Sequence, residues 1–174
     1  MNNDYNHIRI VHQITIRQAN GIISKLREAL FKNRMRLGNR SDLKGKKYLL
    51  LTFFPKCFTG TCSKQLESLR NAWPQLQESD IEVWGVSVVP AEGEKGQRAF
   101  AEFLKLPFPL LPDTGHNLSI LYGAANSPNQ TSARMSVLID KQSIVRWIDK
   151  QINPTTHGLD VVAKVKELEK VYSE

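Results

Sequence analysis

Two continuous apolar runs constrain the fold more than any other feature of this sequence. They are residues 48–54 (YLLLTFF) and 81–89 (IEVWGVSVV). A short apolar run between turn residues is typical of a strand buried on both faces, as in a parallel sheet. Residues 62–77, between the runs, are predicted to be helical because their apolar side chains recur at helical spacing: Leu66, Leu69, Trp73 and Leu76. Pro74 is expected to kink or end that helix.

The following segment continues the alternation of strands and helices. Residues 94–104 are predicted to form a helix that turns Phe100 and Phe103 inward. Residues 107–112 are expected to contain a short extended piece, and residues 116–122 a short helix closed by Gly123. The pattern therefore favours crossover connections between parallel strands.

The last part of the chain predicts a hairpin and a helix. Residues 135–139 and 144–148 are apolar runs joined by the turn Asp140-Lys-Gln-Ser, which is short enough for an antiparallel hairpin. A C-terminal helix follows from apolar residues at helical spacing: Val161, Val162, Val165 and Leu168. The predicted fold is α/β, a thioredoxin-like three-layer sandwich with a central mixed sheet. Ligands of such sheets bind at the carboxyl ends of the first strands, which places the chemistry just after Phe54.

The net charge of +7 is concentrated at the start of the chain. Residues 1–48 hold 11 Lys and Arg against three Asp and Glu, a net charge of +8, so the remainder carries −1. Residues 1–40 are predicted to form a separate extension, a short strand from the alternating isoleucines of residues 8–16 and then a basic amphipathic helix. Residues 41–174 are predicted to form the thioredoxin-like domain.

The composition argues against several partners and cofactors. A solvated basic helix is favoured over a nucleic-acid surface, because no aromatic residues or groove-binding motif accompany the charge. No apolar run reaches the roughly 18 residues of a membrane span, and no secretory signal is recognised, so a cytoplasmic location is expected. The histidines are scattered in the sequence, so no metal site is predicted; they are His7, His12, His116 and His157.

The residues directly after the first apolar run include the candidate chemical group. Cys62 is placed where the next helix begins, and a thiol at a helix N-terminus meets free N–H groups and the positive end of the dipole, which favours thiolate. Thr59 lies three residues earlier and can point its hydroxyl at the same place. Two interpretations stay open on the residues alone. Thr59 is either an N-cap with Cys62 a packing residue, or the pair belongs to a nucleophilic site.

A family resemblance favours the second interpretation. The stretch Pro55-x-x-x-Thr59-x-x-Cys62 is similar to the active-site signature of peroxiredoxins, and Cys62-Ser-Lys-Gln65 resembles the helix start of their bacterioferritin comigratory protein (thiol peroxidase) branch. The stretches 42–55, 84–87 and 134–140 also resemble that family, in the right order. The resemblance covers about residues 40–170.

The resemblance implies a thiol-dependent peroxidase without a cofactor. The Cys62 thiolate would attack a hydroperoxide and become a sulfenic acid. Arg134 would keep the thiolate charged and bind the peroxide oxygens. Thr59 would hold the peroxide in line, Pro55 would shield the thiolate from water, and Gln65 would steady Arg134.

The chain departs from the family pattern at its second thiol. The branch often has a resolving cysteine five residues after the peroxidatic one, where this chain has Glu67. Cys57 is either inert packing, a thiol that meets another chain or a reductant, or the partner of a Cys57–Cys62 disulfide. The favoured mechanism uses one cysteine and an external thiol such as thioredoxin or a small thiol, in a monomer or homodimer. Two alternatives are a thiol–disulfide oxidoreductase or redox switch using both cysteines, and a non-enzymatic binding module using the basic helix.

Overall fold

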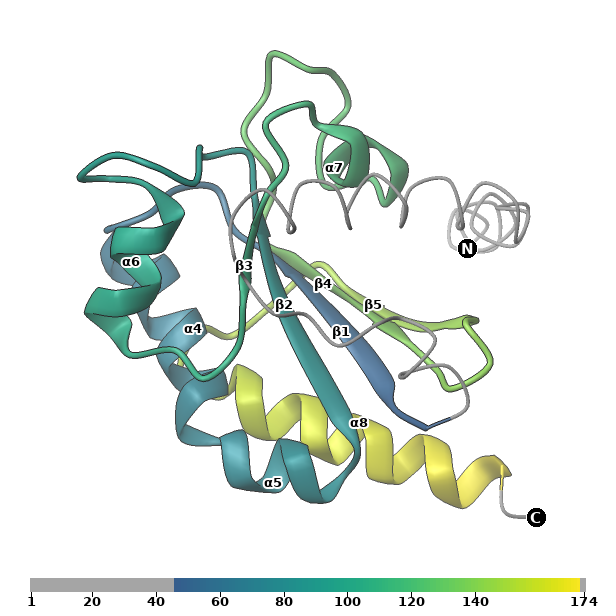
Figure 1. The fold of residues 1–174 in the computed structure, drawn as a ribbon. Coiled ribbons are helices and arrows are strands. Elements are labelled where there is room, and N and C mark those ends of the chain that lie inside the picture. The colour runs from purple at the N-terminus through teal and green to yellow at the C-terminus, as the bar shows by residue number, and fades with distance from the viewer. Residues whose placement is uncertain (1–45, 173–174) are drawn as a thin grey trace.

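The computed structural model describes residues 46–172, which form a five-stranded sheet with helices on both faces (Figure 1). The strand order is β3-β2-β1-β4-β5. Strands β1, β2 and β3 are parallel, whereas β4 is antiparallel to β1 and to β5. The predicted mixed sheet with an antiparallel hairpin is therefore confirmed. The strands are β1 (Tyr48–Phe53), β2 (Ile81–Ser87), β3 (Leu110–Pro112), β4 (Met135–Ile139) and β5 (Val145–Asp149).

The helix expected after β1 is divided in two at Ala72, as Pro74 predicted. Helix α4 spans Gly60–Asn71, and α5 spans Trp73–Glu78 with the proline in its first turn. Proline is tolerated there because the N–H groups of a first turn have no helical acceptor, whereas inside a longer helix the missing N–H would remove a hydrogen bond. The remaining helices are α6 (Gln97–Leu104), α7 (Asn117–Leu121) and α8 (His157–Tyr172).

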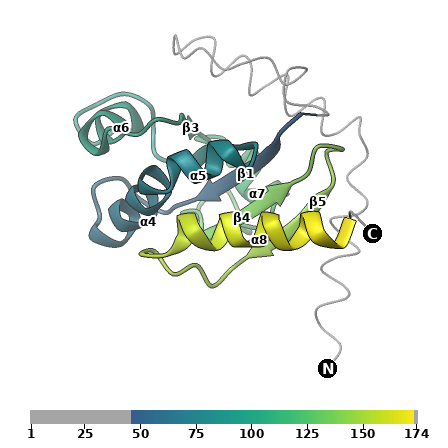
Figure 2. The same cartoon turned by 90° about the horizontal axis from the view of Figure 1, so that it is seen from below.

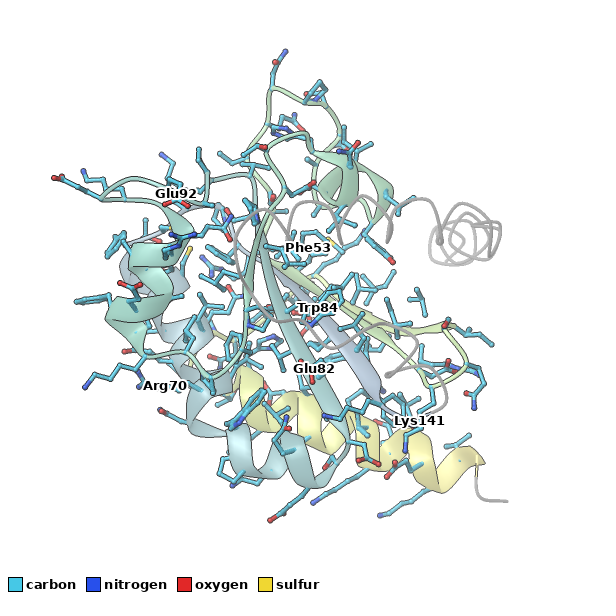
Figure 3. The ribbon with its side chains drawn as sticks, viewed as in Figure 1. Phe53, Arg70, Glu82, Trp84, Glu92 and Lys141 are labelled. Atoms are coloured by element: carbon cyan, nitrogen blue, oxygen red, sulfur yellow. The ribbon has the colours of Figure 1, made fainter. Side chains whose placement is uncertain are left out.

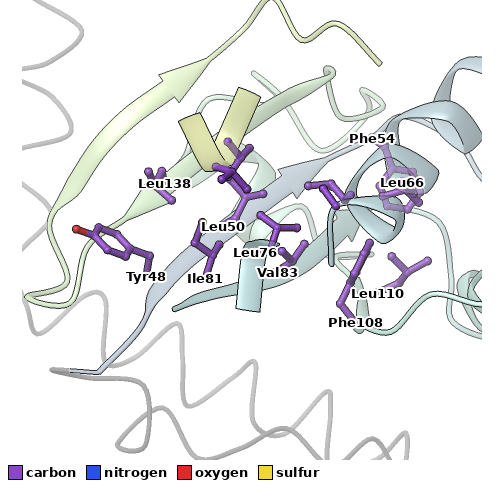
Figure 4. Packing of buried hydrophobic residues seen from close by; sticks show 14 of the residues in the cluster. Tyr48, Leu50, Phe54, Leu66, Leu76, Ile81, Val83, Phe108, Leu110 and Leu138 are labelled. Carbon is purple, nitrogen blue, oxygen red and sulfur yellow. The ribbon is translucent and has the colours of Figure 1, made fainter. Parts of the chain in front are cut away.

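One face of the sheet packs against α4, α5, α6 and α8. Figure 2 shows α4, α5 and α8 lying across the sheet on this side. Leu50 and Phe54 of the first strand region and Leu138 of β4 point into this core (Figure 4). The helices add buried apolar side chains at helical spacing: Leu66, Leu69, Leu76, Phe100, Leu104, Val161, Val162 and Val165.

The opposite face forms a second, smaller core beneath α7. Phe53 and Trp84, labelled in Figure 3, contribute to it, together with Leu118 of α7 and Val137 of β4. Side chains of a strand alternate between faces, so Phe53 belongs to this core while Phe54 belongs to the first. Burial on both faces explains why β1 and β2 read as continuous apolar runs rather than alternating ones.

Helix α6 differs from its prediction in its start and in one inward residue. It begins at Gln97 rather than at residue 94. Phe100 is fully buried as expected, but the inward orientation of Phe103 was wrong, because its side chain is 68% exposed. Helix α6 has only about two turns, and its narrow buried stripe holds one aromatic ring. Phe103 instead packs against the ring of Phe58, with 5.6 Å between ring centroids.

The predicted N-terminal extension of residues 1–40 lies outside the described residues, so its strand and basic helix stay predictions. The same holds for the domain boundary between residues 40 and 41. Within residues 46–172, no helix is long and apolar enough to cross a membrane.

Candidate active site

The predicted site residues Pro55, Thr59 and Cys62 lie on the turn from β1 into α4. Pro55 is half-buried directly after the strand region, and Thr59 occupies the N-cap position of α4 with extended backbone angles. The Thr59 hydroxyl makes no capping hydrogen bond, so Thr59 is an N-cap by position only. Cys62 is the third residue of the helix and is 1% exposed. Its thiol therefore belongs to the first turn, where the helix dipole favours negative charge.

Arg134 lies in hydrogen-bond contact with Cys62. Its Nη2 donates to Cys62 Sγ over 3.6 Å, and its Nη1 lies 3.5 Å from the carbonyl oxygen of Thr61. Sheet topology explains this contact between residues far apart in the sequence. Because β4 runs antiparallel to β1 and pairs Met135 with Phe53, the residue before β4 lies beside the carboxyl end of β1. A guanidinium there supplies a fixed positive charge next to the thiol.

Gln65 links Arg134 to the sheet. Its Oε1 accepts a short hydrogen bond from Arg134 Nη1, while its Nε2 donates to Thr52 Oγ1 over 2.8 Å and to the carbonyl oxygen of Phe53 over 3.3 Å. The direction of the amide follows from its partners, since a guanidinium only donates and a carbonyl only accepts. Gln65 is fully buried, one turn after Cys62 in α4. The structure thus contains the direct contact that the predicted support of Arg134 by Gln65 requires.

Behind Gln65 lies a buried polar cluster that the sequence reasoning missed. Thr52 of β1 and Ser136 of β4 are cross-strand partners, and Ser136 Oγ donates to Thr52 Oγ1 over 2.9 Å. His157, the first residue of α8, places its Nε2 at 2.9 Å from Ser136 Oγ and 3.4 Å from Thr52 Oγ1. All three side chains have no exposed surface. The available signal was a hydroxyl residue within each of two apolar strands, at positions facing the helices.

His157 is neutral in this environment. The pKa of His157 is lowered from 6.5 to about 4, mainly by burial; the negative charge of Asp160 opposes this shift in part, and the positive charge of Arg134 adds to it. Its second ring nitrogen, Nδ1, is buried and has no hydrogen-bond partner among residues 46–172. An added proton would therefore place a poorly compensated charge in the core.

The lowered pKa of His157 predicts that the protein loses stability in mild acid. Between about pH 6.5 and pH 4 the unfolded chain binds a proton on this ring and the folded chain does not. The free energy of unfolding therefore decreases by roughly 3 kcal/mol as the pH is lowered across that window. Chemical denaturation at a series of pH values measures the slope. The variant His157→Gln should show a flatter profile between these limits, and an unchanged slope would contradict the assignment.

Cys57 lies in the same turn but in a different environment. Its half-buried side chain packs against the first core, and it is a free thiol, as is Cys62. Burial, with a smaller effect from the neighbouring Cys62 thiol, raises the pKa of Cys57 to about 12. A thiol with such a pKa is almost entirely protonated near neutral pH and is a weak nucleophile.

An aromatic cluster covers one side of this turn. Phe58 adopts a left-handed backbone conformation with φ of 55°, which is costly for a bulky side chain. Its ring lies 4.9 Å from that of Phe100, measured between centroids, and contacts the exposed Phe103. Packing against Phe100 offsets part of the strain and fixes the turn that carries Cys57 and Thr59.

Residues 46–172 contain no group of three or more His, Cys, Asp or Glu side chains placed to hold a metal ion. The chemistry available at this site is that of a buried thiol beside an arginine, which suits nucleophilic attack and stabilisation of developing negative charge.

Known proteins with similar sequences are named as peroxiredoxins or alkyl hydroperoxide reductases. A chain assigned as peroxiredoxin bcp from Coxiella burnetii is 29% identical over 130 residues, covering 71% of this chain and 83% of that protein. Alkyl hydroperoxide reductase E of Mycobacterium tuberculosis is 32% identical over 108 residues, covering 61% of this chain and 69% of that protein.

Solved structures show the same fold. A cysteine-to-serine variant of PrxQ from Xylella fastidiosa superposes with a TM-score of 0.66 at 22% identity, covering 76% of this chain and 83% of the other. AhpC of Enterococcus faecalis gives a TM-score of 0.65 at 22% identity, with 77% and 81% covered. The predicted thioredoxin-like α/β fold is thereby confirmed.

A family match covers most of the chain. Residues 32–148 match the family described as AhpC/TSA, and this span includes the turn with Cys62 and the strand after Arg134. The resemblance that the Pro-x-x-x-Thr-x-x-Cys pattern indicated is thus confirmed, and neither the redox-switch nor the binding-module alternative is favoured. The chain belongs to the AhpC/TSA family and is a peroxiredoxin, a thiol-dependent peroxidase.

Proposed function

We propose that Cys62 is the peroxidatic residue of this enzyme and that it reduces hydrogen peroxide or organic hydroperoxides. The observation that carries the proposal is the contact between Arg134 and the Cys62 sulfur at the start of α4. The thiolate sulfur attacks the terminal oxygen of the hydroperoxide and the O–O bond breaks. The leaving oxygen takes a proton to become water or an alcohol, and Cys62 becomes a sulfenic acid.

Arg134 has two roles in this proposal. It holds the thiolate by charge and hydrogen bonding before the reaction, and it receives the negative charge that moves onto the leaving oxygen during the reaction. Gln65 keeps the guanidinium in place through its buried amide. Thr59 and Pro55 lie on the same turn, where a hydroxyl can align the peroxide and a ring can exclude water.

The sulfenic acid is reduced by a thiol from outside this chain. A thiol sulfur attacks the Cys62 sulfur and displaces water, and a second thiol then attacks the mixed disulfide and releases Cys62 as a thiol. Cys57 is a poor candidate for the first attack, because its raised pKa keeps it protonated. Thioredoxin and small thiols both supply the required chemistry.

The products of oxidation test this assignment. After rapid mixing with one equivalent of hydrogen peroxide, mass analysis should find one added oxygen on Cys62, with Cys57 unmodified. The matched variant Cys57→Ser should consume peroxide at the wild-type rate with dithiothreitol as reductant. A Cys57–Cys62 disulfide in the wild type, together with loss of turnover in Cys57→Ser, would replace the one-cysteine mechanism with a two-cysteine one.

Organic hydroperoxides are included because a relative at 32% identity is named an alkyl hydroperoxide reductase. A monomer or homodimer and a cytoplasmic location stay predictions from the sequence. Sedimentation of the purified full chain measures the first of these directly.

A further inference from the structure

The buried polar cluster behind Gln65 forms a continuous hydrogen-bonded chain from α8 to the reactive sulfur. It starts at His157, passes through Ser136 and Thr52 to Gln65, and continues through Arg134 to Cys62. Its members come from two strands and two helices, and from the loop before β4. Buried hydroxyl, amide and imidazole groups in an apolar core cost free energy unless their hydrogen bonds are made.

The direction of each bond defines the state of the histidine. Ser136 donates its only hydroxyl proton to Thr52, so its oxygen accepts from His157, and the proton of His157 lies on Nε2. Thr52 Oγ1 then receives two donors, Ser136 from one side and Gln65 from the other. Thr52 is therefore held as an acceptor for the Gln65 amide, and the opposite end of that amide faces Arg134.

The His157 end of this hydrogen-bonded chain is held by a close contact between α8 and α4. The backbone of α8 begins against α4, because Gly158 N–H donates to Ser68 Oγ over 3.0 Å. A Cβ on Gly158 would overlap the carbonyl oxygen of Ser68 and lie 2.7 Å from Ala72 Cβ, so the helices approach here as closely as glycine allows. The His157 ring is consequently fixed by the contact of α8 with the helix that carries Cys62.

We infer that His157 is a positioning residue of the peroxidatic site, which acts through Ser136, Thr52 and Gln65 to hold Arg134 in hydrogen-bond reach of Cys62. The inference rests on the proposed role of Cys62. His157 does not touch the substrate in this arrangement; it supplies the donor that orders the hydroxyl groups. The neutral state of His157 near pH 7 also helps to keep Arg134 in place, because a second positive charge in the cluster would repel the guanidinium.

A double-mutant cycle with Gln65 separates positioning from a merely structural role. His157→Leu should lower the second-order rate constant for reaction of Cys62 with hydrogen peroxide by about tenfold. It should also raise the pH at which alkylation of Cys62 by iodoacetamide reaches half its maximal rate. In a Gln65→Met background, which cannot transmit the effect, His157→Leu should change neither quantity. His157→Gln, which keeps an N–H donor, should restore most of the rate.

Two controls keep the test decisive. Val161→Ala removes apolar contacts from the same helix, so it should lower the melting temperature without moving either reaction profile. If His157→Leu does not fold, Ser136→Ala breaks the same chain one link later and should give the same loss and the same dependence on Gln65.

Three results would overturn the inference. One is a wild-type rate in folded His157→Leu, and another is an equal loss with and without the Gln65 amide. The third is a wild-type protein whose Cys62 does not react with peroxide at all, and this result identifies the proposed function as the part that failed.

Discussion

Replacing Cys62 with serine should reduce peroxide consumption to the rate of the buffer, a loss of more than about 10³-fold. Serine keeps the shape of the side chain and its contact with Arg134, but the hydroxyl is neither ionised near pH 7 nor oxidised by a hydroperoxide. Consumption of hydrogen peroxide in the presence of dithiothreitol measures the effect. In this variant, mass analysis after exposure to hydrogen peroxide should find no added oxygen at position 62.

The serine variant should fold, which makes its loss of activity interpretable. The side chain is buried at the start of α4, and the exchange of sulfur for oxygen changes little volume, so the free energy of unfolding should change by no more than about 1 kcal/mol. Cys57→Ser, five residues earlier, is the matched control and should retain activity. Turnover by Cys62→Ser at the wild-type rate would show that another group carries the reaction.

The fold was predictable from the sequence because its strands differ in pattern from its helices. Residues 48–54 and 81–89 are apolar on both faces, which in water is stable only inside a sheet covered on both sides. The one clear error in orientation, Phe103, arose because helical spacing shows which residues can share a face but not how wide the buried stripe is. The eight residues of α6 bury one aromatic ring and leave the other against Phe58.

Only the part of the candidate site that lies in a contiguous motif was predictable from the residues themselves. The pattern from Pro55 to Cys62 is contiguous, and Arg134 was found through a family resemblance rather than from spacing. Thr52, Ser136 and His157 are 84 and 21 residues apart, and each has an ordinary structural explanation in its own segment. Their proximity depends on the pairing of β1 with β4 and on the docking of α8, which no single segment encodes.

Arg134 is the residue whose replacement should have the second-largest effect. Arg134→Met keeps an unbranched apolar stem but removes the guanidinium and every donor, so the rate constant for reaction of Cys62 with hydrogen peroxide should fall about 10²–10³-fold. Stopped-flow tryptophan fluorescence measures this constant if oxidation changes the emission of one of the three tryptophans; competition with a peroxidase of known rate serves equally.

The conservative variant Arg134→Lys tests geometry apart from charge. A guanidinium donates from two nitrogens at once, here Nη1 to Gln65 and Nη2 to Cys62. An ammonium group is a point charge that cannot make both contacts in the same fixed arrangement, so Arg134→Lys should recover only part of the rate, by about tenfold over Arg134→Met. Full recovery would mean that charge alone matters and that the buried amide of Gln65 does not orient it.

The control for both variants is Arg98→Met. Arg98 makes an ion pair with Glu92 over 2.8 Å, and both side chains are at least half exposed, so its removal should leave the rate constant unchanged. Wild-type reactivity of folded Arg134→Met would contradict the proposed role of the arginine. A loss in Arg134→Met that persists at alkaline pH, where the thiol ionises without help, would assign the larger part of that role to the leaving oxygen, whereas recovery at alkaline pH would assign it to the thiolate.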